Sequence, residues 1–205
     1  LLSRANSSLF CFQEVFFGGV VQAQAYLSNG PVAVFGYAMT LAPKFAQPGL
    51  LREDLRWFGE SWGLGPSDSA IVFLDNHDTQ RGEAKLTYKN GKLYRLASIF
   101  MLAHPYGYPR MMSSYFFDGH DQGPPSTPVH GGSLGCGGEP TGALNLTVPQ
   151  SGPWVCEHRW TAIANMVGWR RAAGSSPISF FPKVSDHDAI VFCRGTSACI
   201  ALNRN

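Results

Sequence analysis

The sequence predicts an α/β fold with a parallel sheet or barrel, followed by a short all-β segment. Three observations support this. Apolar runs alternate with helical patterns over residues 1–174, which is typical of strand–helix units. The run at residues 70–74 is uninterrupted, as in a strand buried on both faces. From residue 175 onward, short strand-like runs separated by turns replace this alternation.

The strands expected in the first part are four apolar segments, each followed by polar or turn residues. They cover residues 9–15, 32–39, 70–74 and 106–115. Helices are expected between and after them, over residues 20–27, 51–63, 92–105 and 157–174. Four strand–helix units amount to half of an eightfold barrel.

Proline and glycine mark the ends of the two longest helices. Pro105 ends the helix that begins at Lys92, because proline cannot continue a helix. Gly174 is expected to cap the last helix. The apolar stripe expected on that last helix comprises Trp160, Ile163, Ala164, Val167 and Ala172. Beyond it, strands are expected over residues 178–181, 188–193 and 198–203.

A dense polar cluster follows the buried strand at residues 70–74. It consists of Asp75, Asn76, His77 and Asp78, with Arg81 three residues later. Ionisable groups are costly to bury unless they are paired, and the carboxyl ends of such strands are where α/β folds build active sites. Taken alone, however, a polar cluster after a strand more often consists of ordinary loop or helix-cap residues than of catalytic ones.

Composition excludes several classes of partner. Of 205 residues, 44% are apolar and 15% charged, which is typical of a folded chain. The net charge is only +2 and lysine and arginine form no run, so no nucleic-acid partner is expected. No apolar stretch reaches membrane-spanning length, so no membrane partner is expected either. Residues 116–152 are rich in glycine, proline and serine and predict a long loop.

Five cysteines are present and none belongs to a C-x-x-C pair, which argues against a zinc site. Cys193 and Cys199 flank a short turn that a disulfide could span. Cys136 and Cys156 bracket part of the long loop and could also be joined. Cys11 lies in an apolar run and is expected to be a buried free thiol. This pattern is compatible with secretion, although sequence leaves the pairing open.

Five segments, in this order, resemble the α-amylases, which are glycoside hydrolases with a (β/α)₈ barrel. The similarity is closest to the chloride-dependent animal-type group. The segments are FQEV ending at Val15, FLDNHDTQRG at 73–82, HPYGYPRMMSSY at 104–115, GPP at 123–125 and WVCEHRW at 154–160. The resemblance implies that residues 1–174 form the second half of the barrel, strands 5 to 8. Residues 175–205 would begin a C-terminal β-sandwich domain of Greek-key topology.

The resemblance also implies a role for five residues. Glu14 would be the general acid/base, and Asp78 the carboxylate that stabilises the transition state. His77 would contact sugar hydroxyl groups, and Asn76 and Arg110 would bind chloride. The nucleophilic aspartate and the calcium ligands of the family belong to an earlier motif that this chain lacks. No metal ligand is therefore expected among these residues, although calcium and chloride are both expected cofactors of the whole enzyme.

The implied reaction is the hydrolysis of internal α-1,4-glucosidic bonds in starch, glycogen and malto-oligosaccharides, with retention of configuration. The whole enzyme would be a secreted, extracellular monomer, and this fragment alone would be inactive. Two alternatives remain: an amylase-like protein that binds glucans without cleaving them, and an α-glucosidase or related transferase. Intact Glu14 and Asp78 argue against the first. Asn76 and Arg110 favour the amylase over the second.

Overall fold

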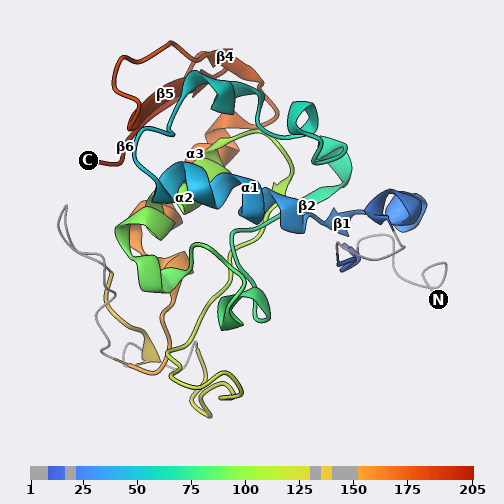
Figure 1. Ribbon diagram of the computed structural model, residues 1–205, viewed down its shortest axis with the longest axis vertical. Coiled ribbons are helices and arrows are strands. Elements are labelled where there is room, and N and C mark those ends of the chain that lie inside the picture. Colours follow the sequence, from blue (N-terminus) through green and yellow to red (C-terminus); the bar gives the residue numbers. More distant parts are fainter. Residues whose placement is uncertain (1–8, 17–21, 130–134, 140–151) are drawn as a thin grey trace.

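Three α-helices lie between a parallel sheet and an antiparallel sheet in the computed structural model (Figure 1). The structure describes residues 9–16, 22–129, 135–139 and 152–205. The parallel sheet contains β1 (Val32–Ala33), β2 (Ala70–Val72) and β3 (Tyr108–Pro109), in that order. All the pairs are parallel, which confirms the α/β class. The strand at residues 70–74 is confirmed as buried on both faces, because every residue of β2 is buried.

The segment at residues 9–15 is not the full strand that its apolar pattern predicts. Gln13 alone pairs with β1, through a parallel bridge to Val32. Leu9 and Phe10 are 62% and 58% exposed. Among the described residues this segment has a neighbour on one side only, so few backbone hydrogen bonds and little packing hold it as a strand.

Residues 32–39 were expected to be a strand, and most of that expectation is wrong. The strand ends at Ala33, and α1 (Phe35–Ala46) begins two residues later. Tyr37, Leu41 and Phe45 are fully buried and four residues apart, so one face of a helix buries all three. This packing outweighs the strand preference of the aromatic and β-branched residues.

The helix expected over residues 51–63 is replaced by two short 3₁₀ helices, Glu53–Trp57 and Glu60–Trp62. Gly59 separates them with φ of +125°, a value that side-chain-bearing residues rarely adopt. A Cβ atom at Gly59 would lie 2.4 Å from a ring carbon of Tyr106, so only glycine fits there. The helix expected over residues 20–27 is a 3₁₀ helix over Ala23–Asn29, and residues 20 and 21 lie outside the described part.

The two longest helices are confirmed. α2 (Lys92–Ala103) ends just before His104 and Pro105, and α3 (Thr161–Ala173) is followed by Gly174 with φ of +53°. The buried stripe of α3 differs from the expected one, because its buried residues are Ile163, Met166 and Ala173. Ala164, Val167 and Ala172 are exposed. The expected strand at residues 106–115 is regular only over the two residues of β3.

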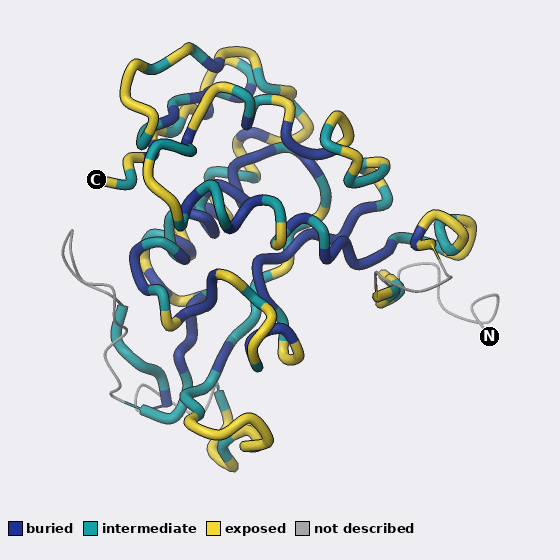
Figure 2. Tube along the Cα trace, viewed as in Figure 1, coloured by how far each residue is buried: buried dark blue, intermediate teal, exposed yellow. Residues whose placement is uncertain are grey.

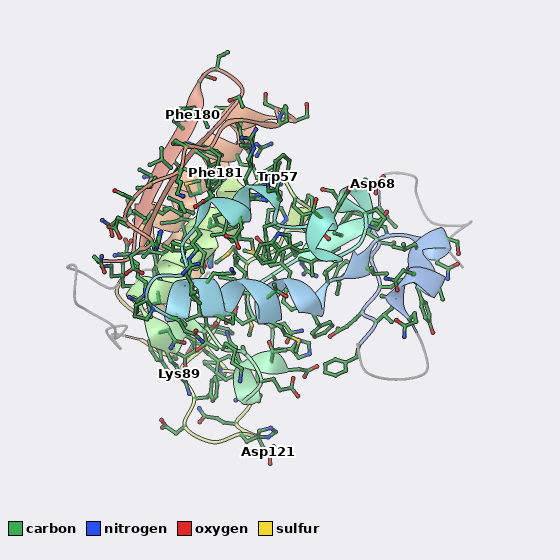
Figure 3. All side chains as sticks on the ribbon, turned by 45° about the horizontal axis from the view of Figure 1, so that its top comes forward. Trp57, Asp68, Lys89, Asp121, Phe180 and Phe181 are labelled. Atoms are coloured by element: carbon green, nitrogen blue, oxygen red, sulfur yellow. A yellow bond between two sulfur atoms is a disulfide. The ribbon has the colours of Figure 1, made fainter. Side chains whose placement is uncertain are left out.

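The antiparallel sheet contains β4 (Ile178–Phe180), β5 (Ala189–Arg194) and β6 (Ala198–Asn203), in that order. These strands confirm the change of pattern after residue 175. The buried side chains of this sheet pack against those of the helices. The sheet and the helices therefore share one core, and both contain buried residues (Figure 2). The ring of Phe181 stacks on that of Phe192, with 5.5 Å between the ring centroids, whereas Phe180 is 52% exposed at the outer surface (Figure 3).

Both expected disulfides are present, Cys136–Cys156 and Cys193–Cys199. Cys11 is a free thiol as expected, but it is exposed rather than buried. The reason is its place in the segment at residues 9–16, where Phe10 and Phe16 are exposed as well. The described parts of the loop at residues 116–152 contain no α-helix and no strand longer than a single bridge residue, Cys136; residues 130–134 and 140–151 are not described. In the part of the chain that the structure describes, no helix combines the length and apolar character required to span a bilayer.

Candidate active site

The polar cluster after β2 borders a pocket of about 390 Å³ at the carboxyl end of the parallel sheet. Its polar lining residues are Glu14, Asp75, Asn76, His77 and Arg110. Its apolar lining residues are Phe12, Ala33, Ile71, Phe73, Met111 and Met112. The lining therefore comes from four segments that are far apart in the sequence. It combines apolar walls with a few convergent polar groups, as ligand sites do.

Strand alternation explains which residues of the central segment face the pocket. Ile71, Phe73 and Asp75 lie two residues apart and line the same side. Val72 and Leu74, which alternate with them, belong to the core on the other side. The apolar run is thus followed by Asp75, an acidic residue that lines the pocket and is nevertheless only 3% exposed.

Asn76 caps the turn that follows. Its side-chain oxygen accepts hydrogen bonds from the backbone N–H groups of Asp78 (3.1 Å) and Thr79 (2.8 Å). Its backbone N–H donates to the Thr79 hydroxyl oxygen at 2.9 Å. Because the oxygen is occupied by these two donors, the amide nitrogen is the atom directed to Glu14, at 3.5 Å from Oε1. Asn76 therefore offers a donor to the pocket.

Arg110 lies on the segment after β3, directly beside the central one, whereas Glu14 lies on the segment that pairs with β1 on the other side of the sheet. The preceding residue, Gln13, fixes the position of Glu14 by donating to the carbonyl oxygens of Tyr26 (3.0 Å) and Gly30 (3.1 Å). Arg110 directly follows β3, where its backbone N–H donates to the Val72 carbonyl oxygen at 2.8 Å. Its guanidinium lies over the ring of Phe12, 4.5 Å from the centroid.

His77 and Asp78 lie at the rim. Their side chains are 72% and 67% exposed, and His77 Nε2 is 3.5 Å from Asp78 Oδ1. His77 borders the pocket, but Asp78 is not among its lining residues. The structure thus brings Glu14, Asn76, His77 and Arg110 together and leaves the Asp78 carboxylate beside His77.

Asp75 is the residue whose importance the sequence does not reveal, since its position there indicates only a turn. Its oxygens accept hydrogen bonds from the Tyr94 hydroxyl (2.9 Å) and the Gln80 amide (2.6 Å). Burial raises its pKa to about 6, against the opposing effect of these two donors. The signal in the sequence is an acidic residue that directly continues an apolar strand.

Two further buried residues, Ser114 and Glu157, lie behind the pocket and are connected to Asp75 through Gln80. Both lie in segments that resemble the family, but the sequence gives neither of them a role, and nothing in it brings together two residues that are separated by 43 positions. As for metals, the described residues include no group of three or more histidine, cysteine or acidic side chains arranged to hold an ion.

Comparisons with known proteins agree with the resemblance predicted from the motifs. The chain is 38% identical over 210 residues to an α-amylase-related protein of Drosophila pseudoobscura pseudoobscura, and 38% identical over 218 residues to a pancreatic α-amylase of Sus scrofa. Each match covers 98% of this chain but only 39% and 41% of the relative. The chain thus spans about two fifths of the length of these curated relatives. No protein-family model matches it.

The fold comparison leads to the same family. The crystal structure of the wild-type α-amylase I of Eisenia fetida matches with a TM-score of 0.79 and 30% identity, covering 100% of this chain and 43% of that one. A mutant of the same enzyme, solved in complex with maltohexaose, matches equally well. The predicted resemblance to α-amylases, over a part of their length, is confirmed.

Proposed function

Because the chain resembles α-amylases along almost its whole length in sequence and fold, we propose that it is part of an α-amylase. Residues 1–174 are the second half of the catalytic barrel, strands 5 to 8, and residues 175–205 begin a Greek-key β domain. The single observation that carries the proposal is the pocket itself. Glu14, Asn76, His77 and Arg110 come from three separate segments and border one cavity at the carboxyl end of parallel strands.

Glu14 is the general acid/base of this mechanism. As an acid it protonates the glycosidic oxygen of the leaving sugar, while a nucleophilic carboxylate attacks the anomeric carbon and forms a covalent glycosyl intermediate. As a base it then removes a proton from the water that hydrolyses this intermediate, so configuration is retained. We propose that the nucleophile belongs to a part of the protein outside this chain, since the chain spans about two fifths of its relatives.

Asp78 and His77 act at the rim, where both are accessible to a polymeric substrate. The Asp78 carboxylate stabilises positive charge that develops on the sugar ring in the transition state, and this attraction becomes stronger when the bound glucan displaces water from the rim. His77 donates a hydrogen bond to a sugar hydroxyl. Substrate must approach both residues over the Glu14 pocket, which is consistent with their place on its edge.

The pocket suits an anion such as chloride. The Asn76 amide nitrogen and the Arg110 guanidinium are both hydrogen-bond donors on its wall, and Glu14 lies 3.5 Å from the former. A bound chloride would supply negative charge that disfavours the ionised form of Glu14 and screens Arg110. The described residues provide no comparable site for calcium, and no step of the mechanism depends on one.

The proposed substrates are starch, glycogen and malto-oligosaccharides, cleaved at internal α-1,4 bonds. Maltohexaose, which is bound in the complex of the Eisenia fetida enzyme mutant, is a ligand of this kind. The two disulfides support secretion into an oxidising compartment, because such bonds are rarely maintained in the cytosol. We propose that the whole enzyme acts there as a monomer.

The test is the variant Glu14→Gln in the full-length protein. It keeps the size of the side chain and removes the transferable proton, so starch hydrolysis should fall by at least about 100-fold while the thermal midpoint is unchanged. Glu83→Gln is the matched control, because Glu83 is exposed and does not border the pocket. Undiminished hydrolysis by Glu14→Gln would remove Glu14 from its role. A wild-type protein that binds maltohexaose without cleaving it would show that the protein is a glucan-binding relative instead.

A further inference from the structure

A chain of buried hydrogen bonds connects the segment after β2 to the segment after β3. The Gln80 amide nitrogen donates both to Asp75 Oδ2 and to Ser114 Oγ, each at 2.6 Å. The Ser114 hydroxyl donates to Glu157 Oε1, and the Ser114 backbone N–H donates to Glu157 Oε2 at 2.8 Å. Glu157 and Ser114 are completely buried, and Asp75 is nearly so. Asp75 and Glu157 are the only two acidic residues that are buried in the described part of the chain.

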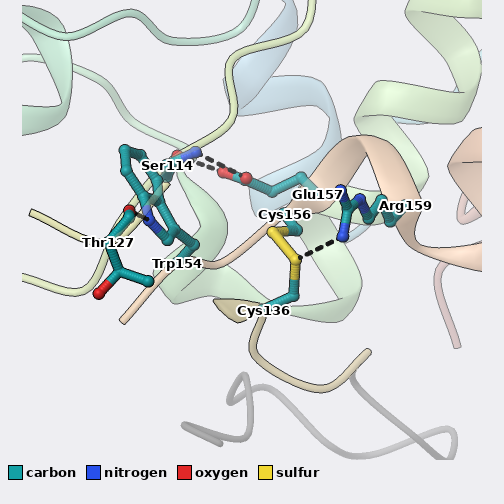
Figure 4. Close-up of a disulfide and its surroundings, with 7 residues drawn as sticks. All are labelled: Ser114, Thr127, Cys136, Trp154, Cys156, Glu157 and Arg159. Carbon is teal, nitrogen blue, oxygen red and sulfur yellow. Dashed lines mark hydrogen bonds between the residues drawn. A yellow bond between two sulfur atoms is a disulfide. The ribbon is translucent and has the colours of Figure 1, made fainter. Parts of the chain in front are cut away.

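Each end of this network is anchored to a rigid part of the fold. Asp75 accepts from the hydroxyl of Tyr94, which lies on α2. Glu157 opens the 3₁₀ helix Glu157–Arg159 ahead of α3, directly after the disulfide-bonded Cys156 (Figure 4). The backbone at Val155 adds a hydrogen bond to the Ser114 carbonyl oxygen, at 2.8 Å. At Ser114, the segment after β3 is therefore hydrogen-bonded both to Gln80 and to the segment that contains Val155 and Glu157.

The position of the network relative to the pocket gives it a role. Gln80 lies in the 3₁₀ helix Thr79–Arg81, for which Asp78 is the N-terminal flanking residue. Ser114 lies four residues after Arg110, on the same extended segment. A hydrogen bond between Gln80 and Ser114 thus fixes the distance between the rim residues and the arginine of the pocket. Neither Gln80 nor Ser114 lines the pocket.

We infer that Ser114 and Glu157 are positioning residues: through Gln80 they hold the segment that carries His77 and Asp78 against the segment that carries Arg110. Burying two carboxyl groups costs desolvation free energy, and each group must be hydrogen-bonded to offset that cost. Burial, and to a smaller extent the charge of the nearby Asp75, raises the pKa of Glu157 to about 7, against the opposing effect of the hydrogen bonds from Ser114. An apolar pair would pack at lower cost but would not fix the two segments in register.

The expected effect of this network on the catalytic rate rests on the proposed function. Its expected effect on how rigidly the two segments are held does not. A displacement of about 1 Å can cost roughly 100-fold in rate when reacting groups must be aligned. Removing the hydroxyl of Ser114 breaks the connection without changing any residue that lines the pocket. We therefore expect Ser114→Ala in the full-length protein to lower kcat for malto-oligosaccharide hydrolysis by at least about tenfold, with KM changed less than about twofold.

Two variants serve as controls. Ser113→Ala removes the neighbouring hydroxyl, whose oxygen is buried and makes no hydrogen bond to any described residue, so it should leave kcat unchanged. Ser114→Thr keeps the hydroxyl and should restore most of the rate. A role confined to stability would lower the thermal midpoint of Ser114→Ala without changing kcat of the folded enzyme, and that outcome would overturn the inference.

A second measurement does not require activity. Amide hydrogen exchange at residues 76–82 should accelerate at least about tenfold in Ser114→Ala and Glu157→Gln relative to the wild type and to Ser113→Ala. If exchange accelerates in a protein that hydrolyses nothing, the positioning role stands and the proposed function fails. If exchange at these residues is unchanged, the positioning inference is wrong, whatever the activity.

Discussion

At the scale of single residues, the chemistry of the pocket depends on donors aimed at one place. The Asn76 oxygen is occupied by two backbone N–H groups, so its amide nitrogen must face Glu14. The Arg110 guanidinium lies on the same pocket and packs on the exposed face of Phe12. Donors from two segments therefore line the same pocket as the Glu14 carboxylate, and such donors can hold a small anion.

Removal of chloride tests this arrangement. In the full-length enzyme, dialysis against a chloride-free buffer of equal ionic strength should lower the rate of starch hydrolysis several-fold, and added chloride should restore it. Arg110→Gln keeps a donor but loses the charge, so its rate should respond little to chloride. The measurement is a chloride titration of both proteins with sulfate as the ionic-strength control. Equal rates with and without chloride in the wild type would contradict the role proposed for Arg110.

At the scale of elements, two arginines, Arg194 on β5 and Arg170 on α3, donate hydrogen bonds to carbonyl groups at and near the ends of the helices. Arg194, on β5, is 2% exposed and donates to the carbonyl oxygens of Ala103 (3.1 Å), Gly174 (2.6 Å) and Ser176 (2.8 Å). Arg170, on α3, donates to the carbonyl oxygens of Leu102, His104 and Gly107. The last carbonyls of a helix have no partner within it and carry partial negative charge, so guanidinium groups satisfy them well.

Loss of the Arg194 hydrogen bonds should destabilise the protein. Arg194→Met keeps much of the apolar volume but leaves three carbonyl groups without a donor, so the free energy of unfolding should fall by about 2–4 kcal/mol. Arg171→Met is the matched control, because Arg171 is exposed on the same helix as Arg170. Thermal unfolding of the full-length variants measures both. An equal midpoint for Arg194→Met and Arg171→Met would show that these hydrogen bonds contribute nothing to stability.

At the scale of the whole molecule, several large apolar side chains in the described part of the chain are exposed to solvent. Leu9, Phe10 and Phe16 are each more than half exposed, and so is Tyr108 on the edge strand β3. Large exposed apolar groups beside an unpaired strand edge favour association. In a complete barrel the remaining strands would cover such a surface.

The 205-residue chain expressed by itself should therefore aggregate and fail to cleave starch. Its short parallel strands leave backbone groups unpaired, and the proposed nucleophile is absent from it. Size-exclusion chromatography with light scattering, followed by a starch assay on each fraction, provides the test. A monodisperse chain that cleaves starch would refute both the half-barrel assignment and the need for a further carboxylate.

The local sequence pattern correctly predicted those elements in which the pattern of apolar residues matches the residues that the fold buries. The buried strand β2 and the helices α2 and α3 appear where expected, because a continuous apolar run or a helical stripe leaves few alternatives. Residues 35–39 were misassigned to a strand because aromatic and β-branched residues favour strands locally, whereas the packing of Tyr37, Leu41 and Phe45 favours a helix over Phe35–Ala46. Similarly, a contact between Gly59 and Tyr106 interrupts the helix expected over residues 51–63.

The sequence alone determined the α/β class, the two disulfides as candidates, and the family resemblance through motifs whose order is specific. It also identified Glu14, Asn76, His77 and Arg110, which the structure brings to one pocket. Only the tertiary structure revealed that Ser114 and Glu157 stand behind Asp75. Hydrogen bonds between residues 43 positions apart depend on how helices and strands pack, and no local pattern encodes that distance.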